Sequence, residues 1–324
     1  MTVTFAGSAD RVESQLVPEA GFELDTFRVS GIPRSLGFSQ LRALWEAGTA
    51  PFACSRILQA RRPDVVLGGG GYVAGPMVLA AWLRRRPAAL TEADARLGLA
   101  NRLAAPFARR VFLAYDVPGR HGGKYRVVGR PIPVAHRGAT RDEGRRLFGL
   151  PEDRPVVAVF GALAGARSLN ELAVDAWGTT GPAVLHISGQ RDYDALRPRV
   201  ARADYVLVPQ TDRFGAALAA ADVAVSRAGG TVWELAAAGT PAILVPYPHA
   251  TGDHQAINAR HFEEGGGAIV VPDAEVKRVP SLVDELLADP ECLARMRAAM
   301  RALARPDAAE EIAEELIRLA SARR

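Results

Sequence analysis

The chain has 324 residues, of which 48% are apolar and 23% are charged, and its formal net charge is +4. These values are typical of folded globular proteins and exclude disordered and fibrous chains. The length favours two domains, each able to bury its own core. The longest uncharged apolar stretch, residues 72–83, is far shorter than the roughly 20 residues of a membrane span.

Cysteine usage and the first residues bear on the compartment. Cys54 and Cys292 are the only cysteines, and neither has a partner at metal-ligand spacing. A disulfide framework and a zinc site are therefore not expected. Met1 leads directly into a predicted strand, without the basic and apolar regions of a secretory leader. We expect a cytoplasmic protein.

The positive charge comes almost entirely from arginine and favours anionic partners. Phosphorylated sugars, nucleic acid and an acidic membrane surface all meet that criterion. The sequence carries no helix-turn-helix, zinc or RNP signature, so we expect no nucleic-acid partner.

Short β-branched runs alternate along the chain with helical segments rich in Ala, Leu and Arg. This alternation predicts parallel βαβ units, and it restarts after residue 150. Strands are predicted at residues 2–5, 24–29, 64–67, 88–91, 111–114 and 126–128 in the first half and at residues 156–160, 183–187, 205–208, 223–226, 242–245 and 268–271 in the second. The expected fold class is α/β, with two Rossmann-like doubly wound domains.

The pattern predicts three parts in chain order. Residues 1–135 form the first Rossmann-like domain and residues 136–305 the second. In the C-terminal segment 306–324, apolar residues share one face of a predicted helix, namely Ile312, Leu316 and Leu319. We expect this helix to dock back on the first domain.

Two glycine-containing turns follow predicted strands in the second half. Residues 161–167 lie where a buried strand meets the next helix, and helix N-termini attract phosphate. In residues 226–234, two glycines turn the chain and a helix starts with Thr231, three residues before Glu234. Thr and Glu at this spacing can form a capping box, in which Glu234 would cap the helix N-terminus. The alternative is that Glu234 accepts hydrogen bonds from a ribose diol.

Polar side chains crowd the segment after the strand predicted at residues 242–245. They are His249, Asp253, His254, Gln255 and Asn258. The spacing of the two histidines suits no helical pair of metal ligands. Recognition of sugar hydroxyls fits this segment better.

Six segments give the chain a close resemblance to one enzyme family. They are residues 62–76, 98–103, 127–131, 165–171, 227–234 and 246–260. Through them the chain resembles, over nearly its whole length, the MurG family of glycosyltransferases of peptidoglycan synthesis. The resemblance implies transfer of N-acetylglucosamine from UDP-N-acetylglucosamine to lipid I, the undecaprenyl-diphosphate-linked N-acetylmuramyl-pentapeptide, giving lipid II.

The resemblance further implies a GT-B fold whose two domains face each other across a cleft. The acceptor and the membrane face belong to the first domain and the UDP-sugar to the second, and the inverting transfer needs no metal or other cofactor. The expected donor-site residues are Glu234 for the ribose, Gln255 and His254 for the sugar hydroxyls, the backbone near Thr211 for the uracil, Gly229, Gly230 and Thr231 for the diphosphate, and Asp94 and Leu163 at two further positions of the family pattern.

Acceptor chemistry is implied for the first domain. Gly69, Gly70 and Gly71 are expected to face the acceptor diphosphate. The acceptor hydroxyl loses a proton as it attacks the anomeric carbon, so a base within hydrogen-bond reach is needed. The candidate catalytic residues are Glu92 and Tyr72.

The chain departs from the family pattern in several places. It begins after the strand, GGTGGH-type loop and helix that open the family, which leaves a start further upstream and an inactive remnant as two explanations. Losing a central strand should leave unpaired backbone and an opened core. Single substitutions are Asp94 and Arg130 in place of asparagine, Pro133 in place of arginine and Leu163 in place of serine.

These departures keep two other functions open. One is a related UDP-sugar transferase with another acceptor, and the other is a catalytically silent protein that binds sugar nucleotides. Asp192 and Asp194 resemble the metal-binding DxD sequence of other glycosyltransferases. Because they follow a turn in a loop, we expect no metal there.

Aromatic residues of the first half lie near arginine runs at residues 84–86 and 109–110. They are Trp45, Phe52, Trp82 and Phe107. Apolar groups rimmed by arginine suit an anionic leaflet, so we expect peripheral attachment to the cytoplasmic face of the inner membrane. The alternative is that these aromatics belong to the core. The expected partners are thus UDP-N-acetylglucosamine, the lipid-linked acceptor and an anionic membrane surface.

Overall fold

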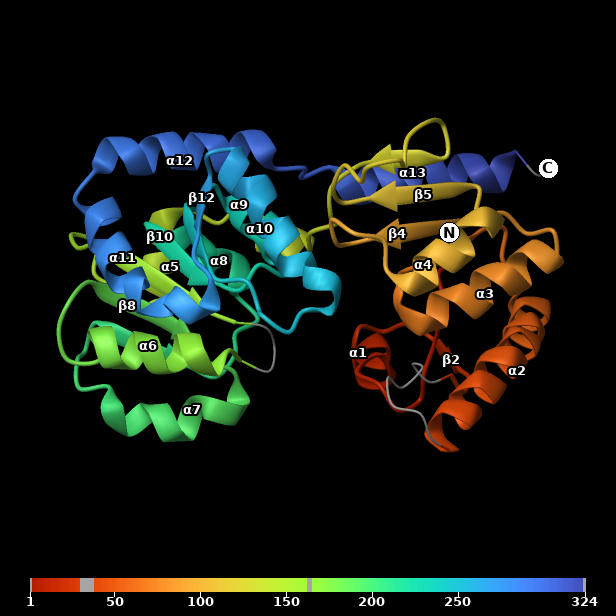
Figure 1. Ribbon diagram of the computed structural model, residues 1–324, viewed down its shortest axis with the longest axis horizontal. Coiled ribbons are helices and arrows are strands. Elements are labelled where there is room, and N and C mark those ends of the chain that lie inside the picture. The colour runs from red at the N-terminus through yellow and green to blue at the C-terminus, as the bar shows by residue number, and fades with distance from the viewer. Residues whose placement is uncertain (1, 30–37, 162–164, 323–324) are drawn as a thin grey trace. The chain divides into compact units, whose positions relative to one another are not determined.

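The computed structural model describes residues 2–29, 38–161 and 165–322, and for residues 38–47 the backbone only. The chain divides into two compact units (Figure 1). The first unit comprises Met1–Val128 and Glu310–Arg324, and the second comprises Gly129–Ala309. Both units are α/β with parallel strands, which confirms the predicted fold class.

The second unit is built on a six-stranded parallel sheet. Its strands are β7 (Val156–Phe160), β8 (Ala183–Ile187), β9 (Tyr205–Val208), β10 (Val223–Ser226), β11 (Ala242–Leu244) and β12 (Ala268–Val270), in the spatial order β12-β11-β10-β7-β8-β9. Every residue of β7 and β10 is buried, as expected for central strands with helices on both faces. From β7 the chain runs outward to β8 and β9, whereas β10 returns to the other side of β7. The strand order therefore reverses between β7 and β10.

The helices of the second unit lie before, between and after these strands. They are α5 (Arg141–Phe148), α6 (Arg167–Trp177), α7 (Gln190–Leu196), α8 (Phe214–Ala220), α9 (Val232–Ala238), α10 (His254–Glu264), α11 (Val279–Leu287) and α12 (Pro290–Leu303), with short 3-10 helices η2 (Val134–His136), η3 (Arg197–Arg199), η4 (Thr251–Asp253) and η5 (Asp273–Arg278). Helix α5 starts with a capping box in which the Thr140 and Glu143 side chains each accept the other residue's backbone N–H. It ends at Gly149, whose φ of 65° favours glycine.

A fully buried arginine ties α5 to the sheet of the second unit. Arg145 has no exposed surface, and its guanidinium donates to four backbone carbonyls and to Asp222 Oδ2 (2.7 Å). The same carboxylate oxygen accepts the backbone N–H of Val156 at the start of β7 (2.8 Å). The charge is thus paired and hydrogen-bonded, which a buried guanidinium requires.

In the first unit the strands form two separate sheets. β1 (Phe5–Gly7) pairs with β2 (Leu24–Thr26) in a two-stranded sheet, and a second sheet holds β3 (Val66–Gly68), β4 (Ala88–Glu92), β5 (Arg110–Leu113) and β6 (Tyr125–Val127) in that order. Among the described residues no strand joins β1 or β2 to β3.

The helices of the first unit lie before and between these strands, except for the last. They are α1 (Glu13–Glu19), α2 (Phe38–Arg61), α3 (Gly71–Leu83), α4 (Leu99–Ala104), the 3-10 helix η1 (Ala105–Phe107) and α13 (Ala308–Ser321). Helix α13 runs beside β5 (Figure 1), and its apolar residues pack against Ala89, Phe112 and Val128. Glu315, almost fully buried, accepts hydrogen bonds from Arg110 (2.6 Å) and Arg126 (3.3 Å).

The predicted strands coincide with the observed ones with one displacement. The strand expected at residues 2–5 is Phe5–Gly7, and the other eleven predicted strands overlap observed strands with ends that differ by at most three residues. In the described part of the chain, none of the helices combines the length and the apolar character that a bilayer crossing requires.

Candidate functional site

Three neighbouring strands of the second unit bring the predicted donor-site segments together. β10 pairs with β7 on one side and with β11 on the other, so Ser226 lies beside Phe160 and Leu244. The segments that follow these residues therefore leave the sheet at one edge. The strand order reverses at this edge, and open α/β sheets bind ligands at the carboxyl ends of strands at such a switch point.

The turn between β10 and α9 presents free backbone donors at that edge. Gly229, Gly230 and Thr231 are half-buried. Within the described part of the chain, none of their three backbone N–H groups has a hydrogen-bond partner. Consecutive free N–H groups at the start of a helix suit an anion, so this turn can receive a phosphate group.

Glu234 lies one turn further along α9 and forms a contact that the sequence did not reveal. Its Oε1 lies 2.5 Å from His136 Nδ1, and both side chains are mostly buried. Thr231 makes no side-chain cap of α9, so the capping box that was the alternative reading of Glu234 is absent. His136 is 98 residues away in the sequence, and no local pattern could have paired the two.

His136 is itself held by the residues that start α8. A Cβ atom on Gly215 would lie 2.5 Å from the His136 backbone, so only glycine permits this approach. The imidazole also meets the Phe214 ring edge to face at 5.8 Å. The histidine therefore has a fixed position from which it orients Glu234.

Arg227 anchors the same turn to the rest of the sheet edge. Its guanidinium is 8% exposed and donates to the carbonyls of Val245 (3.0 Å) and Pro246 (3.2 Å) beyond β11. It also donates to Ser168 Oγ in α6 (2.7 Å) and pairs with Asp273 (2.7 Å). Through these contacts Arg227 fixes the loops around the site.

The loop after β11 carries the residues predicted to recognise a sugar. Gln255 Oε1 accepts the backbone N–H of Tyr247 (2.9 Å), and within the described residues its Nε2 group has no partner. His254 Nδ1 lies 2.9 Å from a carbonyl of η4. Asn258, fully buried, donates to the Ala228 carbonyl (3.3 Å). The last contact binds α10 to the β10–α9 turn.

The remaining predicted donor residues are Thr211, Asp94 and Leu163. Thr211 lies after β9, the last strand of the sheet, where its Oγ1 accepts the Arg213 N–H (3.0 Å). Asp94 belongs to the first unit. Leu163 lies outside the described residues.

A glycine turn leads from β3 into α3 in the first unit. Gly70 and Gly71 have φ values of 94° and 67°, which favour glycine, and a Cβ on Gly69 would meet nothing within 4 Å. Tyr72 follows in the first turn of α3 and is 42% exposed. Its hydroxyl oxygen accepts a hydrogen bond from Arg11 Nη2 (3.2 Å).

Glu92 ends β4, which pairs with β3, and the residue is only 8% exposed. Oε2 accepts the Gly98 N–H (2.8 Å) and Asn101 Nδ2 (2.9 Å), and Oε1 accepts the Asp94 N–H (3.3 Å). These contacts close the loop between β4 and α4. The sequence pointed to Glu92 but not to this role, because its partners lie up to nine residues further along the chain.

The DxD-like segment has ordinary structural contacts. Asp192 lies in α7, where Arg191 and Asn170 donate to its carboxylate. The hydrogen bond from Arg191 lowers the pKa of this carboxyl below its usual value. Among the described residues no group of three or more His, Cys, Asp and Glu side chains is arranged to hold a metal ion.

Family comparisons cover both units. Residues 1–113 match the glycosyltransferase family 28 N-terminal domain, and residues 156–312 match the glycosyltransferase family 28 C-terminal domain. A protein of Rubrobacter xylanophilus is 40% identical over 322 residues, covering 97% of this chain and 94% of its own length. A protein of Halothermothrix orenii is 34% identical over 324 residues, covering 94% and 87%. Both are named UDP-N-acetylglucosamine–N-acetylmuramyl-(pentapeptide) pyrophosphoryl-undecaprenol N-acetylglucosamine transferase.

Solved structures agree with these matches. The crystal structure of Acinetobacter baumannii MurG superimposes with a TM-score of 0.77 at 26% identity, covering 98% of this chain and 91% of that one. The calicheamicin glycosyltransferase CalG4 superimposes with a TM-score of 0.68 at 18% identity, covering 98% and 91%. The second likeness concerns the fold alone.

Proposed function

Since the chain belongs to the MurG family within glycosyltransferase family 28, we propose that it catalyses the reaction for which its relatives are named. It transfers N-acetylglucosamine from UDP-N-acetylglucosamine to lipid I and so forms lipid II for peptidoglycan synthesis. One observation carries this conclusion: relatives that bear this name are 33–40% identical and cover 94–98% of the chain.

The reaction exchanges one bond at the anomeric carbon for another. The acceptor hydroxyl oxygen bonds to that carbon, the bond from the carbon to the β-phosphate oxygen breaks, and the electron pair leaves with UDP. The hydroxyl proton passes to a base. The protein therefore has to stabilise negative charge on a diphosphate and to accept one proton.

The second unit is proposed to hold the donor. The free N–H groups of Gly229, Gly230 and Thr231 would receive the diphosphate, and Glu234 would accept hydrogen bonds from the ribose diol. His136 supports this role because it holds the carboxylate in one orientation. The unpaired Nε2 group of Gln255 suits a sugar hydroxyl.

The first unit is proposed to hold the acceptor at the glycine turn of residues 69–71. The two candidate bases there differ in access. Tyr72 is 42% exposed, whereas Glu92 is 8% exposed and its carboxylate already accepts three hydrogen bonds. This difference favours Glu92 as the residue that positions the loop after β4, with Tyr72 nearer to the acceptor.

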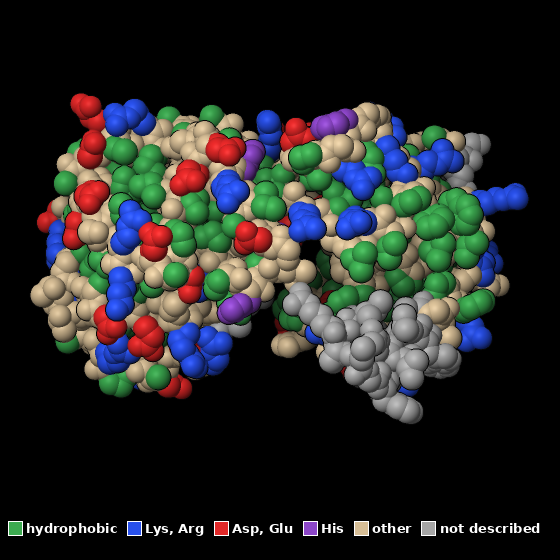
Figure 2. All heavy atoms as spheres, viewed as in Figure 1, with side chains coloured by type: hydrophobic (Ala, Val, Ile, Leu, Met, Phe, Trp, Pro, Cys, Tyr) green, Lys and Arg blue, Asp and Glu red, His purple; other side chains and the backbone are tan. Residues whose placement is uncertain are grey.

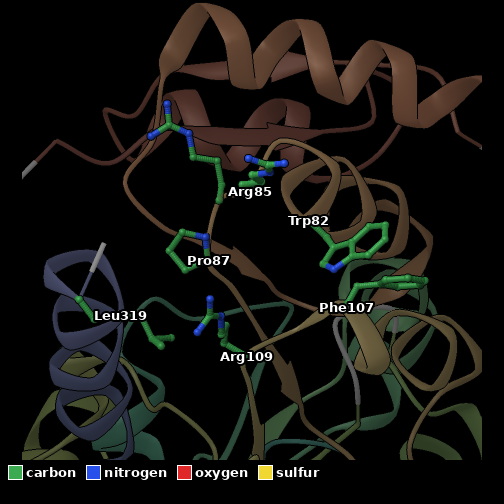
Figure 3. A pocket seen from close by; sticks show the side chains of 8 residues that line it. Trp82, Arg85, Pro87, Phe107, Arg109 and Leu319 are labelled. Carbon is green, nitrogen blue, oxygen red and sulfur yellow. The ribbon is translucent and has the colours of Figure 1, made fainter. Parts of the chain in front are cut away.

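An anionic membrane surface is proposed to contact the first unit. Trp82 packs against Phe107 with ring centroids 5.1 Å apart, beside a pocket of about 370 Å³ that Arg85, Arg86 and Arg109 also line. Figure 3 shows Trp82 and Phe107 together on one side of this pocket and Leu319 of α13 on the other.

Helices α2, α3 and α4 of the first unit also carry exposed apolar residues. They include Phe52, Trp82, Leu83, Leu99 and Leu103. Figure 2 shows apolar side chains interspersed with Lys and Arg on this unit. Apolar side chains among arginines match a headgroup layer of anionic lipid. The side chain of Trp45, which was predicted to join them, is not among the described ones.

The test is transfer of labelled N-acetylglucosamine from its UDP donor to a lipid I analogue in vesicles. The expected product is the disaccharide-linked lipid, and Glu234→Ala should reduce its formation through weaker donor binding. A folded protein that binds UDP-N-acetylglucosamine without transferring it would instead be a silent sugar-nucleotide-binding protein. Transfer only to a different acceptor would indicate a related transferase.

A further inference from the structure

Arg130 lies directly against the turn that is proposed to bind the donor diphosphate. A Cβ atom on Gly230 would stand 1.8 Å from Arg130 Nη1 and 2.1 Å from its Cζ. The φ of Gly230 is not positive, so glycine is not needed there for the backbone conformation. It is needed because it leaves room for the guanidinium.

This guanidinium carries a charge that the protein does not pair. Among the described residues, Arg130 takes part in no hydrogen bond or ion pair, although it is only partly exposed. Arg227, in the same turn, contrasts with it because carbonyls, Ser168 and Asp273 occupy its guanidinium. A partly buried cation without a partner favours an anion from solution.

The free backbone N–H groups of Gly229, Gly230 and Thr231 lie in the same turn as this cation's neighbour Gly230. Together with the guanidinium they suit a phosphate group. Phosphate oxygens accept hydrogen bonds from backbone N–H groups, and a guanidinium can donate to two phosphate oxygens at once.

We propose that Arg130 is the cation that binds the diphosphate of the UDP-sugar. When the bond between the anomeric carbon and the β-phosphate oxygen breaks, its electron pair leaves with UDP. The guanidinium stabilises the negative charge on that leaving group. The inference rests on the proposed function, because it uses the same donor site. It adds a side chain that binds the diphosphate beside the backbone N–H groups of the turn.

Calorimetric titration of the full chain with UDP tests the proposal. Arg130→Met keeps the length of the side chain and removes its charge, and it should weaken UDP binding by about tenfold to a hundredfold. Arg130→Lys should recover part of the loss. Arg295→Met is the matched control, because it removes one equally charged, exposed side chain from α12 and should leave the UDP affinity unchanged.

A second substitution displaces the guanidinium without removing it. Gly230→Ala puts a methyl group where Arg130 lies, and the backbone there accepts alanine. It should weaken UDP binding in the natural chain and have little further effect beside Arg130→Met. Equal effects of Gly230→Ala in both backgrounds would show that the two residues act independently and would overturn the proposal.

The outcomes separate this proposal from the function on which it rests. Unchanged UDP affinity in Arg130→Met, while Glu234→Ala still weakens binding, would refute the role of Arg130 and leave the donor site in place. Failure of the natural chain to bind UDP would overturn both. Uridine, which lacks phosphate, serves as the control for correct folding. Its affinity should be the same in the natural chain and in Arg130→Met.

Discussion

The two units use parallel strands in different ways. In the second unit β7 has hydrogen-bonded strands on both sides, and β7 and β10 are buried throughout. In the described part of the first unit, β3 is an end strand of its sheet, β1 and β2 pair only with each other, and Phe5 and Leu67 are 40% and 42% exposed. In the second unit, the paired strands β7, β10 and β11 fix the positions of the loops that follow them. In the first unit, the glycine turn of residues 69–71 follows β3, which pairs with β4 on one side.

This difference explains why the donor site is the better defined of the two. Arg227 and Asn258 connect loops from several strands at the switch point of the second unit. Around Glu92 in the first unit, the contacts join residues within ten positions in the sequence. The comparison predicts that substitutions in the second unit act through a cooperative network, and those in the first unit act locally.

The largest expected effect is loss of the buried Arg145 cluster. Arg145→Met leaves Asp222 without its buried cation and frees the carbonyls, which should destabilise the second unit by about 3–5 kcal/mol. Chemical denaturation measures this. Arg146→Met, on the exposed side of the same helix, should change stability by less than about 0.5 kcal/mol. Equal effects of the two would show that the network does not support the sheet.

Acid should weaken the second unit through His186. This residue is fully buried between Tyr205 Oη (2.8 Å) and Asn170 Oδ1 (3.0 Å), and burial lowers its pKa from 6.5 to about 3. Between these values the unfolded chain binds a proton that the folded chain does not, so stability falls as the pH falls. From pH 7 to pH 5 the free energy of unfolding should drop by about 2 kcal/mol.

The measurement for His186 is denaturation of the full chain at both pH values. A variant without the imidazole, His186→Gln, should lose this part of the pH dependence. The first unit supplies the contrast: burial raises the pKa of Cys54 to about 12, so its thiol is neutral at pH 5 and at pH 7 and contributes nothing. An unchanged pH dependence in His186→Gln would place the acid sensitivity elsewhere.

Glu92→Ala tests whether effects in the first unit are local. The change removes the acceptor of the Gly98 N–H, and Asn101 Nδ2 keeps only its bond to the Thr91 carbonyl, at a cost of about 1–3 kcal/mol. The transfer rate should fall while UDP affinity stays constant. Tyr72→Phe is the companion change, since it keeps the ring and removes the hydroxyl. A loss of UDP affinity in either variant would contradict the proposal that the second unit alone binds the donor.

His136→Asn should have the smallest effect. The shorter side chain no longer holds Glu234 in place, and donor affinity should fall about threefold to tenfold, comparable to one ordinary hydrogen bond. The Michaelis constant for UDP-N-acetylglucosamine should rise more than the turnover number falls. A Glu234→Ala background should remove most of this effect, because the two residues then no longer act together.

Sequence patterns located the strands because buried parallel strands are continuous apolar runs of fixed length. They also located Glu234 and the glycine turn after β10, because both lie within a few residues of a strand end. The partners of these residues were not predictable. His136 meets Glu234 across 98 residues, and the approach of Arg130 to Gly230 spans a hundred. The roles expected for Glu234, Gln255, Tyr72 and the other candidate residues stay predictions.

The most direct test of the account is calorimetric titration with UDP-N-acetylglucosamine of the natural chain, Glu234→Ala and the first-unit variant Tyr72→Phe. The account predicts that one donor molecule binds, that Glu234→Ala weakens binding by about tenfold to a hundredfold, and that Tyr72→Phe binds as tightly as the natural chain. Donor binding that survives Glu234→Ala but is lost in Tyr72→Phe would contradict the assignment of the donor to the unit with the continuous sheet.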